Sequence, residues 1–319
     1  MDESIRAGFV DPGIAKEWNL IDYGVTTSIA NCSHTSRYPF KRGFRASELP
    51  GALRENGLAS ENPTIWQYAR AAGYRTILID ALGEGVFHSG RNSDEISYID
   101  ESIYISSRPH FMRDFDALAK LRAIVSRPGR DFIWVDKQGA HHPFQQKYPP
   151  DFVPSFTGPA VNVPESAEWR EYQRELLDRY NKAVGWSASK FLAELFKPGL
   201  PTGTFLVYTS DHGQSLVENS TKWSQCSWGP MTVAGEGLVP LLLFATPDSP
   251  FAQKLKADAT EFKGRYSQFE VFPTLLIALG FSPAWVTESY GTSLLDFPPA
   301  QRSFLKGGDE RVLEWHRVD

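Results

Sequence analysis

Short apolar runs alternate with longer amphipathic stretches along the chain. The runs have the length of buried strands, whereas the stretches between them repeat their apolar residues at helical spacing. The predicted strands cover residues 75–80, 131–136, 204–208 and 238–244, and the predicted helices cover residues 62–73, 116–126, 167–195 and 268–279. This alternation predicts an α/β fold with a mostly parallel central sheet and helices on both faces.

Two proline-containing segments refine this prediction. Pro240 lies inside the last apolar run, and because proline has no backbone N–H we expect this strand at a sheet edge or with a later start. Residues 143–164 are rich in proline and aromatic side chains, which predicts a long surface excursion.

Composition and charge narrow the classes of function. The chain has 319 residues, and its 33 Lys and Arg against 38 Asp and Glu give a net charge of −5. This acidic balance argues against nucleic acid as a partner. No apolar run approaches the roughly 20 residues of a membrane helix, and no secretion signal is visible at the start. Cys32 and Cys226 are too few for a disulfide scaffold, and one bridge or two free thiols both remain open.

Polar residues at the ends of the predicted strands are the candidates for catalysis or ligand binding. In open α/β sheets, ligands bind beyond the carboxyl ends of the strands. Asp211 and His212 follow the strand 204–208, and Gly213 after them allows a tight turn. A carboxylate beside an imidazole is half of a zinc or mixed-ligand metal site. An aspartate that caps the next helix, beside a structural histidine, is the alternative interpretation.

Three further positions carry weaker signals. His141 and His142 follow the strand 131–136, and at most one of these adjacent side chains is expected to face the same site as Asp211. Glu3 lies in an acidic chain start, which is ordinarily just solvated. The hydroxyl residues of the segment 23–32 are typical of helix caps, but a hydroxyl at a helix N-terminus is also suited to act as a nucleophile.

The order of these motifs resembles the phosphoethanolamine transferase and sulfatase-like branch of the alkaline phosphatase superfamily. Residues 3–6 match its Glu-Ser/Thr-x-Arg motif, and residues 210–216 match its Ser-Asp-His-Gly-Glu-Ser-Leu motif except at Gln214. Residues 139–143 are similar to its Gly-Ser-His-Gly-Pro loop. The resemblance extends from residue 2 to about residue 295 and implies an alkaline-phosphatase-like fold.

The resemblance also implies a metal site. Its expected occupant is zinc, or manganese or another divalent metal, and its expected ligands are Glu3, Thr26, Asp211 and His212. A metal lowers the pKa of a hydroxyl that it binds, so Thr26 is the expected nucleophile and forms a phospho-threonine intermediate.

The family's other catalytic positions are carried over by spacing. Thr26 lies six positions before Cys32, as the nucleophile does in the family, but counting from Gly24 favours Thr27, so both threonines remain candidates. His141 is similar to the family's histidine that binds the phosphoryl group or protonates the leaving group, and we prefer it to His142 by register.

The function implied by the resemblance is a metal-dependent transferase. It would move a phospho-headgroup from a phospholipid donor to a lipid or glycan acceptor such as lipopolysaccharide, at the periplasmic face of the bacterial inner membrane. Residues 81–86 differ from the family's Asn-rich run, and residues 222–228 contain no histidine, so we expect a headgroup pocket that differs from the one for phosphoethanolamine.

Two alternatives stay open. One is a phosphodiesterase or phosphatase that uses water as the acceptor, and the other is a degenerate member that only binds glycans or lipid headgroups. A sulfatase would need a Cys/Ser-x-Pro-x-Arg motif for formylglycine, and the segment 32–37 lacks that proline.

The start of the chain bears on its extent. The resemblance makes Glu3 the end of the first sheet strand, yet only Met1 and Asp2 precede it, fewer than the roughly five residues of a strand. We therefore expect residues 1–319 to be a single catalytic domain that lacks its first strand and an upstream membrane region, through which membrane contact would occur.

Overall fold

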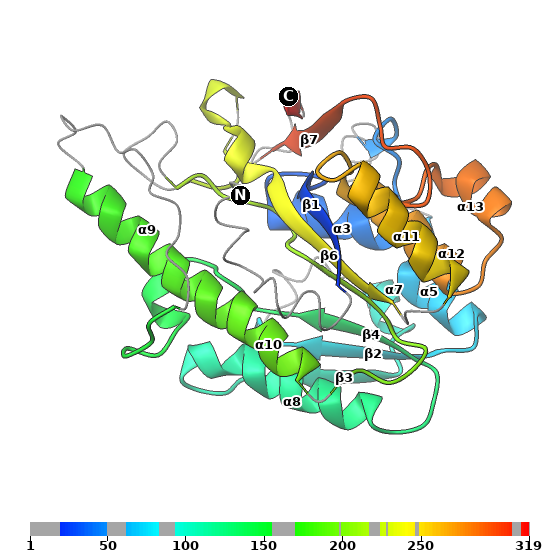
Figure 1. Cartoon of the computed structure of the whole chain (residues 1–319), viewed down its shortest axis with the longest axis horizontal. Coiled ribbons are helices and arrows are strands. Elements are labelled where there is room, and N and C mark those ends of the chain that lie inside the picture. The colour runs from blue at the N-terminus through cyan, green and yellow to red at the C-terminus, as the bar shows by residue number, and fades with distance from the viewer. Residues whose placement is uncertain are drawn as a thin grey trace.

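The computed structural model describes residues 20–49, 62–82, 93–154, 170–197, 199–216, 224–227, 229–245, 249–307 and 314–318 (Figure 1). Its strands are β1 (Ile21–Thr27), β2 (Arg75–Asp80), β3 (Glu101–Tyr104), β4 (Asp131–Asp136), β5 (Phe205–Thr209), β6 (Leu238–Ala245), β7 (Arg302–Lys306) and β8 (Glu314–Val318). Its helices are α3 (Ser33–Arg42), α5 (Ile65–Ala71), α7 (Ser93–Ile96), α8 (Arg113–Val125), α9 (Arg170–Val184), α10 (Phe191–Phe196), α11 (Pro250–Glu261), α12 (Val271–Ala278) and α13 (Pro283–Tyr290).

The strands form three small sheets in the described residues, in the orders β1-β6-β5, β3-β2-β4 and β7-β8. The α/β class is confirmed, but the expected mostly parallel arrangement is corrected by β6. Pairing is parallel from β2 to β3 and β4, whereas β6 is antiparallel to β1 and β5, and β7 is antiparallel to β8. The first paired residue of β6, Leu241, lies opposite the last residue of β5, Thr209, and the two strands then run in opposite directions.

The position of β6 also corrects the prediction drawn from its proline. This strand lies between β1 and β5, not at an edge. Pro240 is opposite Val25 of β1, but the pairing with β5 begins only at Leu241. At Pro240 the strand therefore has a neighbour on one side only, which makes the missing N–H tolerable.

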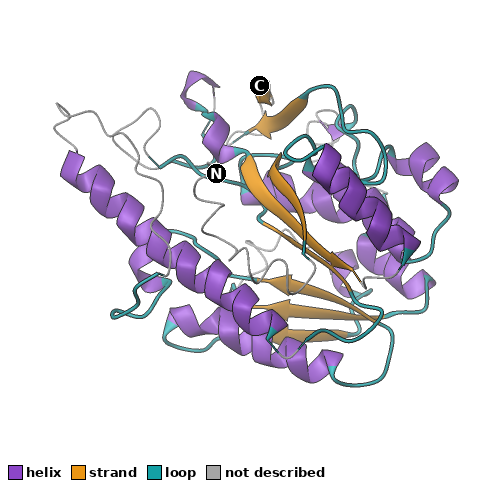
Figure 2. Ribbon diagram, in the orientation of Figure 1, coloured by secondary structure: helices purple, strands orange, loops and turns teal. Residues whose placement is uncertain are grey.

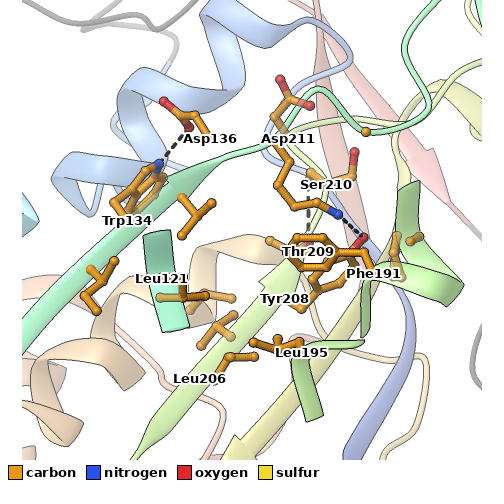
Figure 3. A pocket seen from close by; sticks show the side chains of 18 of the residues that line it. Leu121, Trp134, Asp136, Phe191, Leu195, Leu206, Tyr208, Thr209, Ser210 and Asp211 are labelled. Atoms are coloured by element: carbon orange, nitrogen blue, oxygen red, sulfur yellow. Dashed lines mark hydrogen bonds between the residues drawn. The ribbon is translucent and has the colours of Figure 1, made fainter. Parts of the chain in front are cut away.

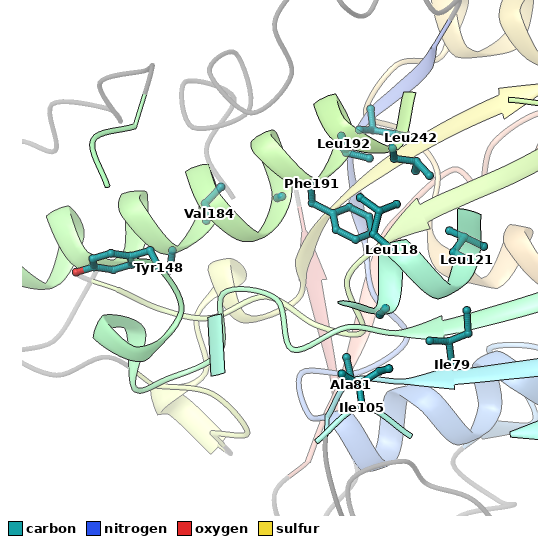
Figure 4. Close-up of a cluster of buried hydrophobic side chains, with 14 of the residues drawn as sticks. Ile79, Ala81, Ile105, Leu118, Leu121, Tyr148, Val184, Phe191, Leu192 and Leu242 are labelled. Carbon is teal, nitrogen blue, oxygen red and sulfur yellow. The ribbon is translucent and has the colours of Figure 1, made fainter. Parts of the chain in front are cut away.

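Helices cover both faces of the sheets, as predicted (Figure 2). Ile77 and Ile79 of β2 pack in one core with α8, α9 and α10, and Leu78 between them packs on the other face with α5 and α12. Figure 4 shows part of the first core, where Leu118, Phe191 and Leu192 approach Leu242 of β6. In the described part of the chain, no helix is both long and apolar enough to cross a membrane.

The helix predicted over residues 167–195 is interrupted where it passes the sheets. A π-helical segment, η3 (Gly185–Lys190), separates α9 from α10. A wider turn of this kind leaves backbone carbonyl groups accessible to side chains, and such segments are frequent at functional sites.

Candidate active site

A cavity of about 1210 Å³ lies between β4 and β5, the end strands of two different sheets. One end of the cavity is polar, and Asp136, Ser210 and Asp211 lie there in Figure 3. The other walls are largely apolar and come from α8, α10 and the two strands (Figure 3). The candidate chemistry is therefore at the carboxyl ends of β4 and β5, as the general rule for α/β sheets predicts.

Ser33 is one of the hydroxyl residues that the fold brings to the polar end of the cavity. It is the first residue of α3, and its Oγ lies 3.1 Å from Nε2 of His212. Cys32 precedes it as the N-cap and makes no side-chain capping bond. Anions are favoured at such a helix N-terminus because free backbone N–H groups and the helix dipole stabilise negative charge.

His212 is held in one orientation by its own loop. Its Nδ1 lies 2.6 Å from the carbonyl oxygen of Gly213, which fixes the proton on Nδ1 and leaves a lone pair on Nε2, toward Ser33. Gly213 is required here because the backbone passes close to Gly235, where a Cβ would lie 2.2 Å from a carbonyl oxygen. The glycine therefore serves a close approach of two loops.

Asp211 carries a negative charge in this site. Burial raises the pKa of its carboxyl group, but His212, Arg37 and a hydrogen bond from Ser33 outweigh burial and bring the pKa below its usual value. Its carbonyl oxygen accepts a hydrogen bond of 2.5 Å from Ser36 Oγ. The carboxylate is thus fixed next to both Ser33 and His212.

Arg37 brings a positive charge to the same end of the cavity. Its guanidinium group forms a buried ion pair with Asp136, the last residue of β4. Burial tends to lower the pKa of Arg37, but Asp136 and Asp211 raise it above the usual value, so the side chain stays charged. The first turns of α3 therefore contribute both a hydroxyl and a cation.

A disulfide bond settles the question that the sequence left open for the cysteines. Cys32 is bonded to Cys226, which ties the start of α3 to a loop 194 residues further along. Asn31 reinforces this contact, because its carbonyl accepts the Cys226 N–H and its amide donates to Glu236 at 2.7 Å. The bridge is adjacent to Ser33, so it holds the candidate hydroxyl in place.

The structure does not bring Thr26 or Thr27 into the cavity. Both are fully buried at the end of β1, and neither lines the cavity within the described residues. Thr26 Oγ1 donates to the carbonyl oxygen of Val239 at 3.3 Å, and Thr27 Oγ1 has no hydrogen-bond partner there. Ser33 lies where the sequence reasoning expected one of these threonines.

The histidine pair after β4 divides as the register suggests. His141 lines the cavity, whereas the His142 ring packs against Phe144 with 5.5 Å between ring centroids. Gln214 Nε2 donates to the Ala140 carbonyl at 3.4 Å, which joins the His141 loop to the Asp211–His212 loop. Glu3, the other predicted ligand, lies outside the described residues.

The donors at the polar end suit a divalent cation in part. Asp211 offers a carboxylate, His212 an unprotonated Nε2 and Ser33 a hydroxyl, the oxygen and nitrogen donors that zinc binds. Among the described residues no group of three or more His, Cys, Asp and Glu side chains is placed to hold a metal.

Comparison with known proteins shows the family to which the chain belongs. The sequence profile of the sulfatase family matches residues 22–281. The chain belongs to the sulfatase family. No curated protein sequence matches it significantly. The matched range includes Ser33, Asp211 and His212 at the polar end of the cavity.

Several solved structures are similar to the chain. The periplasmic domain of EcEptC from Escherichia coli, in complex with zinc, is 18% identical (TM-score 0.70; 98% of this chain, 85% of that chain). The soluble domain of lipooligosaccharide phosphoethanolamine transferase A from Neisseria meningitidis is 15% identical (TM-score 0.59; 82% and 78%). Phosphonate monoester hydrolase of Agrobacterium radiobacter is 14% identical (TM-score 0.60; 92% and 74%). At these identities the likeness establishes the fold.

Sequence reasoning missed Ser33 and Arg37. The family spacing places the nucleophile before Cys32, whereas the residues of this segment that line the cavity come after Cys32. One signal was available: Ser33 precedes Arg37 by four positions, the separation of the first and last residues in Cys/Ser-x-Pro-x-Arg, with Thr35 in place of the proline.

Proposed function

We propose that this protein is a metal-dependent phosphoryl-group transferase with Ser33 as its nucleophile. The observation that carries the proposal is the 3.1 Å approach of Ser33 Oγ to His212 Nε2, at the first residue of α3 and at the polar end of the cavity. A hydroxyl in this position lies beside an imidazole nitrogen that can bind the same metal, at a helix terminus that stabilises negative charge.

The residues at the polar end of the cavity have separate roles in the proposed reaction. Ser33 Oγ attacks the phosphorus of a phosphodiester and gives its proton to water, and Arg37 stabilises the negative charge that develops. The bond from phosphorus to the leaving alkoxide breaks as the bond to Ser33 Oγ forms, and the alkoxide takes a proton from His141 or water. A divalent cation bound at Asp211, His212 and Ser33 would lower the pKa of the serine hydroxyl.

The second half of the reaction returns the enzyme to its first state. An acceptor alcohol or water attacks the phosphorus of the phospho-Ser33 intermediate, and Ser33 Oγ leaves. With an alcohol the protein is a transferase, and with water it is a hydrolase. The name of the Neisseria relative, a lipooligosaccharide phosphoethanolamine transferase, favours a lipooligosaccharide acceptor, and the periplasmic domain from E. coli favours a periplasmic location.

Sulfate ester hydrolysis is the competing function within the family. Sulfatases of the formylglycine type oxidise a Cys or Ser of their motif. Cys32 is in a disulfide bond and has no free thiol to oxidise, and Ser33 lacks the proline of that motif. Both observations favour an unmodified hydroxyl and a phosphoryl substrate.

The test compares two aryl esters with the zinc-loaded protein. We expect turnover of bis(4-nitrophenyl) phosphate, loss of that turnover in Ser33→Ala, and no turnover of 4-nitrophenyl sulfate. Addition of glycerol should divert product from nitrophenyl phosphate to a glycerol phosphodiester if the protein is a transferase. Sulfate turnover that persists in Ser33→Ala, with no phosphodiester turnover, would overturn the proposal.

A further inference from the structure

The polar end of the cavity has two carboxylates among the described residues, and both are already engaged. Asp136 is paired with Arg37 and also accepts the Trp134 N–H at 2.8 Å (Figure 3). Asp211 lies beside Ser33 and is a candidate metal ligand. An ammonium headgroup therefore finds no free carboxylate at this end in the described part of the chain.

Lys147 is a cation at the same end with little compensation. It lines the cavity, is only 8% exposed, and donates from Nζ to Gln138 Oε1 at 3.2 Å. Neither a further hydrogen-bond acceptor nor an ion-pair partner for this ammonium group is present among the residues that the structure describes. Two of its three N–H bonds are thus open to a ligand.

Lys137 shows by contrast how a buried lysine is satisfied in this fold. Its Nζ donates to the carbonyl oxygen of Ser187 and lies 3.6 Å from the centroid of the Phe191 ring. Asp114 Oδ2 is 3.9 Å from the same Nζ. Lys137 therefore has its partners within the protein, whereas Lys147 does not.

The nearest carboxylate does not neutralise Lys147. Asp114 accepts the backbone N–H groups of Gln138 and Gly139, at 2.7 and 3.1 Å. Burial lowers the pKa of Lys147, Asp114 opposes this, and Arg113 lowers the pKa further. An anion bound to Nζ would favour the charged form of the lysine and offset the cost of its burial.

The position of Lys147 is fixed before any ligand binds. Its N–H donates to the carbonyl oxygen of Phe144 at 2.9 Å, and Phe144 and Tyr148 on either side are buried in the core with α9. Gln138 is held through its own backbone N–H by Asp114. Because the Gln138 amide oxygen accepts from Lys147, the amide nitrogen of the same side chain remains as a second donor.

This pair of donors is close to the reacting end of the cavity. Gln138 and Lys147 lie at the two ends of the loop that carries His141, and all three line the cavity. Partial burial lowers the pKa of His141, and the charges of both Lys147 and Asp211 also act on it. One small molecule can therefore contact the Asp211 side and Lys147 together.

We propose that Lys147 and the Gln138 amide form an anion subsite, which binds a second acidic group of the substrate, a carboxylate or a phosphate, beside the phosphorus attacked by Ser33. The inference rests on the proposed function, because it places that phosphorus at Ser33. It adds that the enzyme selects an acidic substrate over one with a neutral or an amine headgroup.

The first test measures binding to the zinc-loaded protein by calorimetry. The probes are phosphonocarboxylates with chains of two to six carbons, each compared with the alkylphosphonate and the aminoalkylphosphonate of equal length. None is an ester, so none is turned over. At the length that lets the carboxylate reach Lys147, the acid should bind at least about tenfold more tightly than the alkylphosphonate. The amine should gain nothing.

Variants at the subsite decide what causes the preference for the acid. Lys147→Met removes the ammonium group, and Gln138→Glu gives the lysine a carboxylate partner. Both should abolish the preference and leave the affinity for the alkylphosphonate unchanged, which also shows that the variants are folded. Lys147→Arg should retain part of it. Lys120→Met is the matched control, because this exposed lysine of α8 does not line the cavity.

Turnover distinguishes the two parts of the substrate that could carry the acid. A higher kcat/KM for 4-nitrophenyl carboxyalkyl phosphates than for the alkyl esters would place the acid on the transferred group. Faster transfer from phospho-Ser33 to a hydroxy acid than to the matching alcohol would place it on the acceptor. Lys147→Met should remove whichever preference is found.

The outcomes separate this inference from the proposed function. A preference for the acid that persists in Lys147→Met would mean that the carboxylate binds the metal, and it would overturn the subsite. Equal affinities at every length would also overturn it, even if the alkyl esters are cleaved through Ser33. A preference that depends on Lys147, with no turnover of any ester, would support the subsite and overturn the proposed function.

Discussion

The carboxyl ends of β5 and β4 meet at one cavity, yet they use their polar residues differently. After β5, Asp211 and His212 face Ser33 and leave donor atoms directed at one point. After β4, the charges are engaged in fixed pairs, Asp136 with Arg37 and Lys137 beside Asp114. Under the proposed function, the end of β5 carries the reaction and the end of β4 provides fixed charges beside it.

The largest effect on activity is expected at the end of β5, from loss of the Ser33 hydroxyl. Ser33→Ala removes the proposed nucleophile and should lower kcat for a phosphodiester by roughly 10³-fold or more, as loss of a nucleophile does elsewhere. Thr26→Val, which removes a hydroxyl in the interior of β1, should keep kcat within a few fold and cost about 1 kcal/mol of stability. Steady-state kinetics and denaturant unfolding distinguish the two, and a silent Ser33→Ala would contradict the assignment.

A second comparison separates metal binding from ion pairing. His212→Gln and Asp211→Asn each remove a donor at the end of β5, so zinc affinity should fall by at least about 10- to 100-fold. Asp136→Asn breaks a buried ion pair at the end of β4, so it should lower the free energy of unfolding by about 3 kcal/mol and leave the zinc affinity close to that of the wild type. Competition with a chelating dye measures the affinities, and equal losses in all three variants would remove the distinction.

Removal of the disulfide bond shows how much it stabilises the start of α3, where Ser33 lies. The bond closes a loop with a sequence separation of 194, so Cys32→Ser with Cys226→Ser should lower the free energy of unfolding by up to about 5 kcal/mol. Because Ser33 follows Cys32, activity should fall even under conditions where the variant remains folded. Thiol titration of the unfolded, unreduced wild type should find no free thiol, and two titratable thiols would contradict the bond.

An effect confined to stability is expected behind the β5 end, at η6 (Gln268–Glu270). Burial raises the pKa of Glu270 to about 7, although hydrogen bonds from Ser267 oppose it. An unfolded glutamate has a pKa of about 4.3, so the native state binds more protons between these values and the free energy of unfolding falls as pH rises from about 4 to about 7.

Glu270→Gln should flatten that pH dependence. The amide cannot ionise but its oxygen still accepts the Ser267 N–H, so at pH 8 we expect a gain of up to about 3 kcal/mol over the wild type. Denaturant unfolding across pH 4–8 measures the slope. Glu261→Gln, at an exposed position, is the control that should leave it unchanged, and an unaltered slope in Glu270→Gln would refute the explanation.

The elements that periodicity indicated are the ones that bury regular apolar faces. The strands predicted over 75–80 and 131–136 match β2 and β4, and the helix ending before Gly280 matches α12. The orientation of β6 was not predictable, because an apolar run has the same pattern in a parallel and an antiparallel strand. The π-helical break at Gly185–Lys190 was also missed, since it leaves the apolar spacing of the helix nearly intact.

The site was predictable to the extent that its residues follow strands in sequence. Asp211, His212 and His141 lie directly after β5 or β4, and all three line the cavity. Ser33 and Arg37 are brought there by the turn from β1 into α3, whose length the sequence pattern did not define. Thr26 had the right residue type, but the end of β1 pairs with β6 and buries it.

The most direct measurement is the site of covalent phosphorylation. The zinc-loaded protein is quenched in acid during turnover of bis(4-nitrophenyl) phosphate, and the tryptic peptide spanning residues 17–37 is sequenced by mass spectrometry. This single peptide contains Ser33 together with Thr26 and Thr27, so its fragment ions decide among them. We expect the nitrophenyl phosphate adduct on Ser33 and none in Ser33→Ala. An adduct on Thr26 or Thr27, or turnover by an enzyme that never carries one, would contradict the central claim.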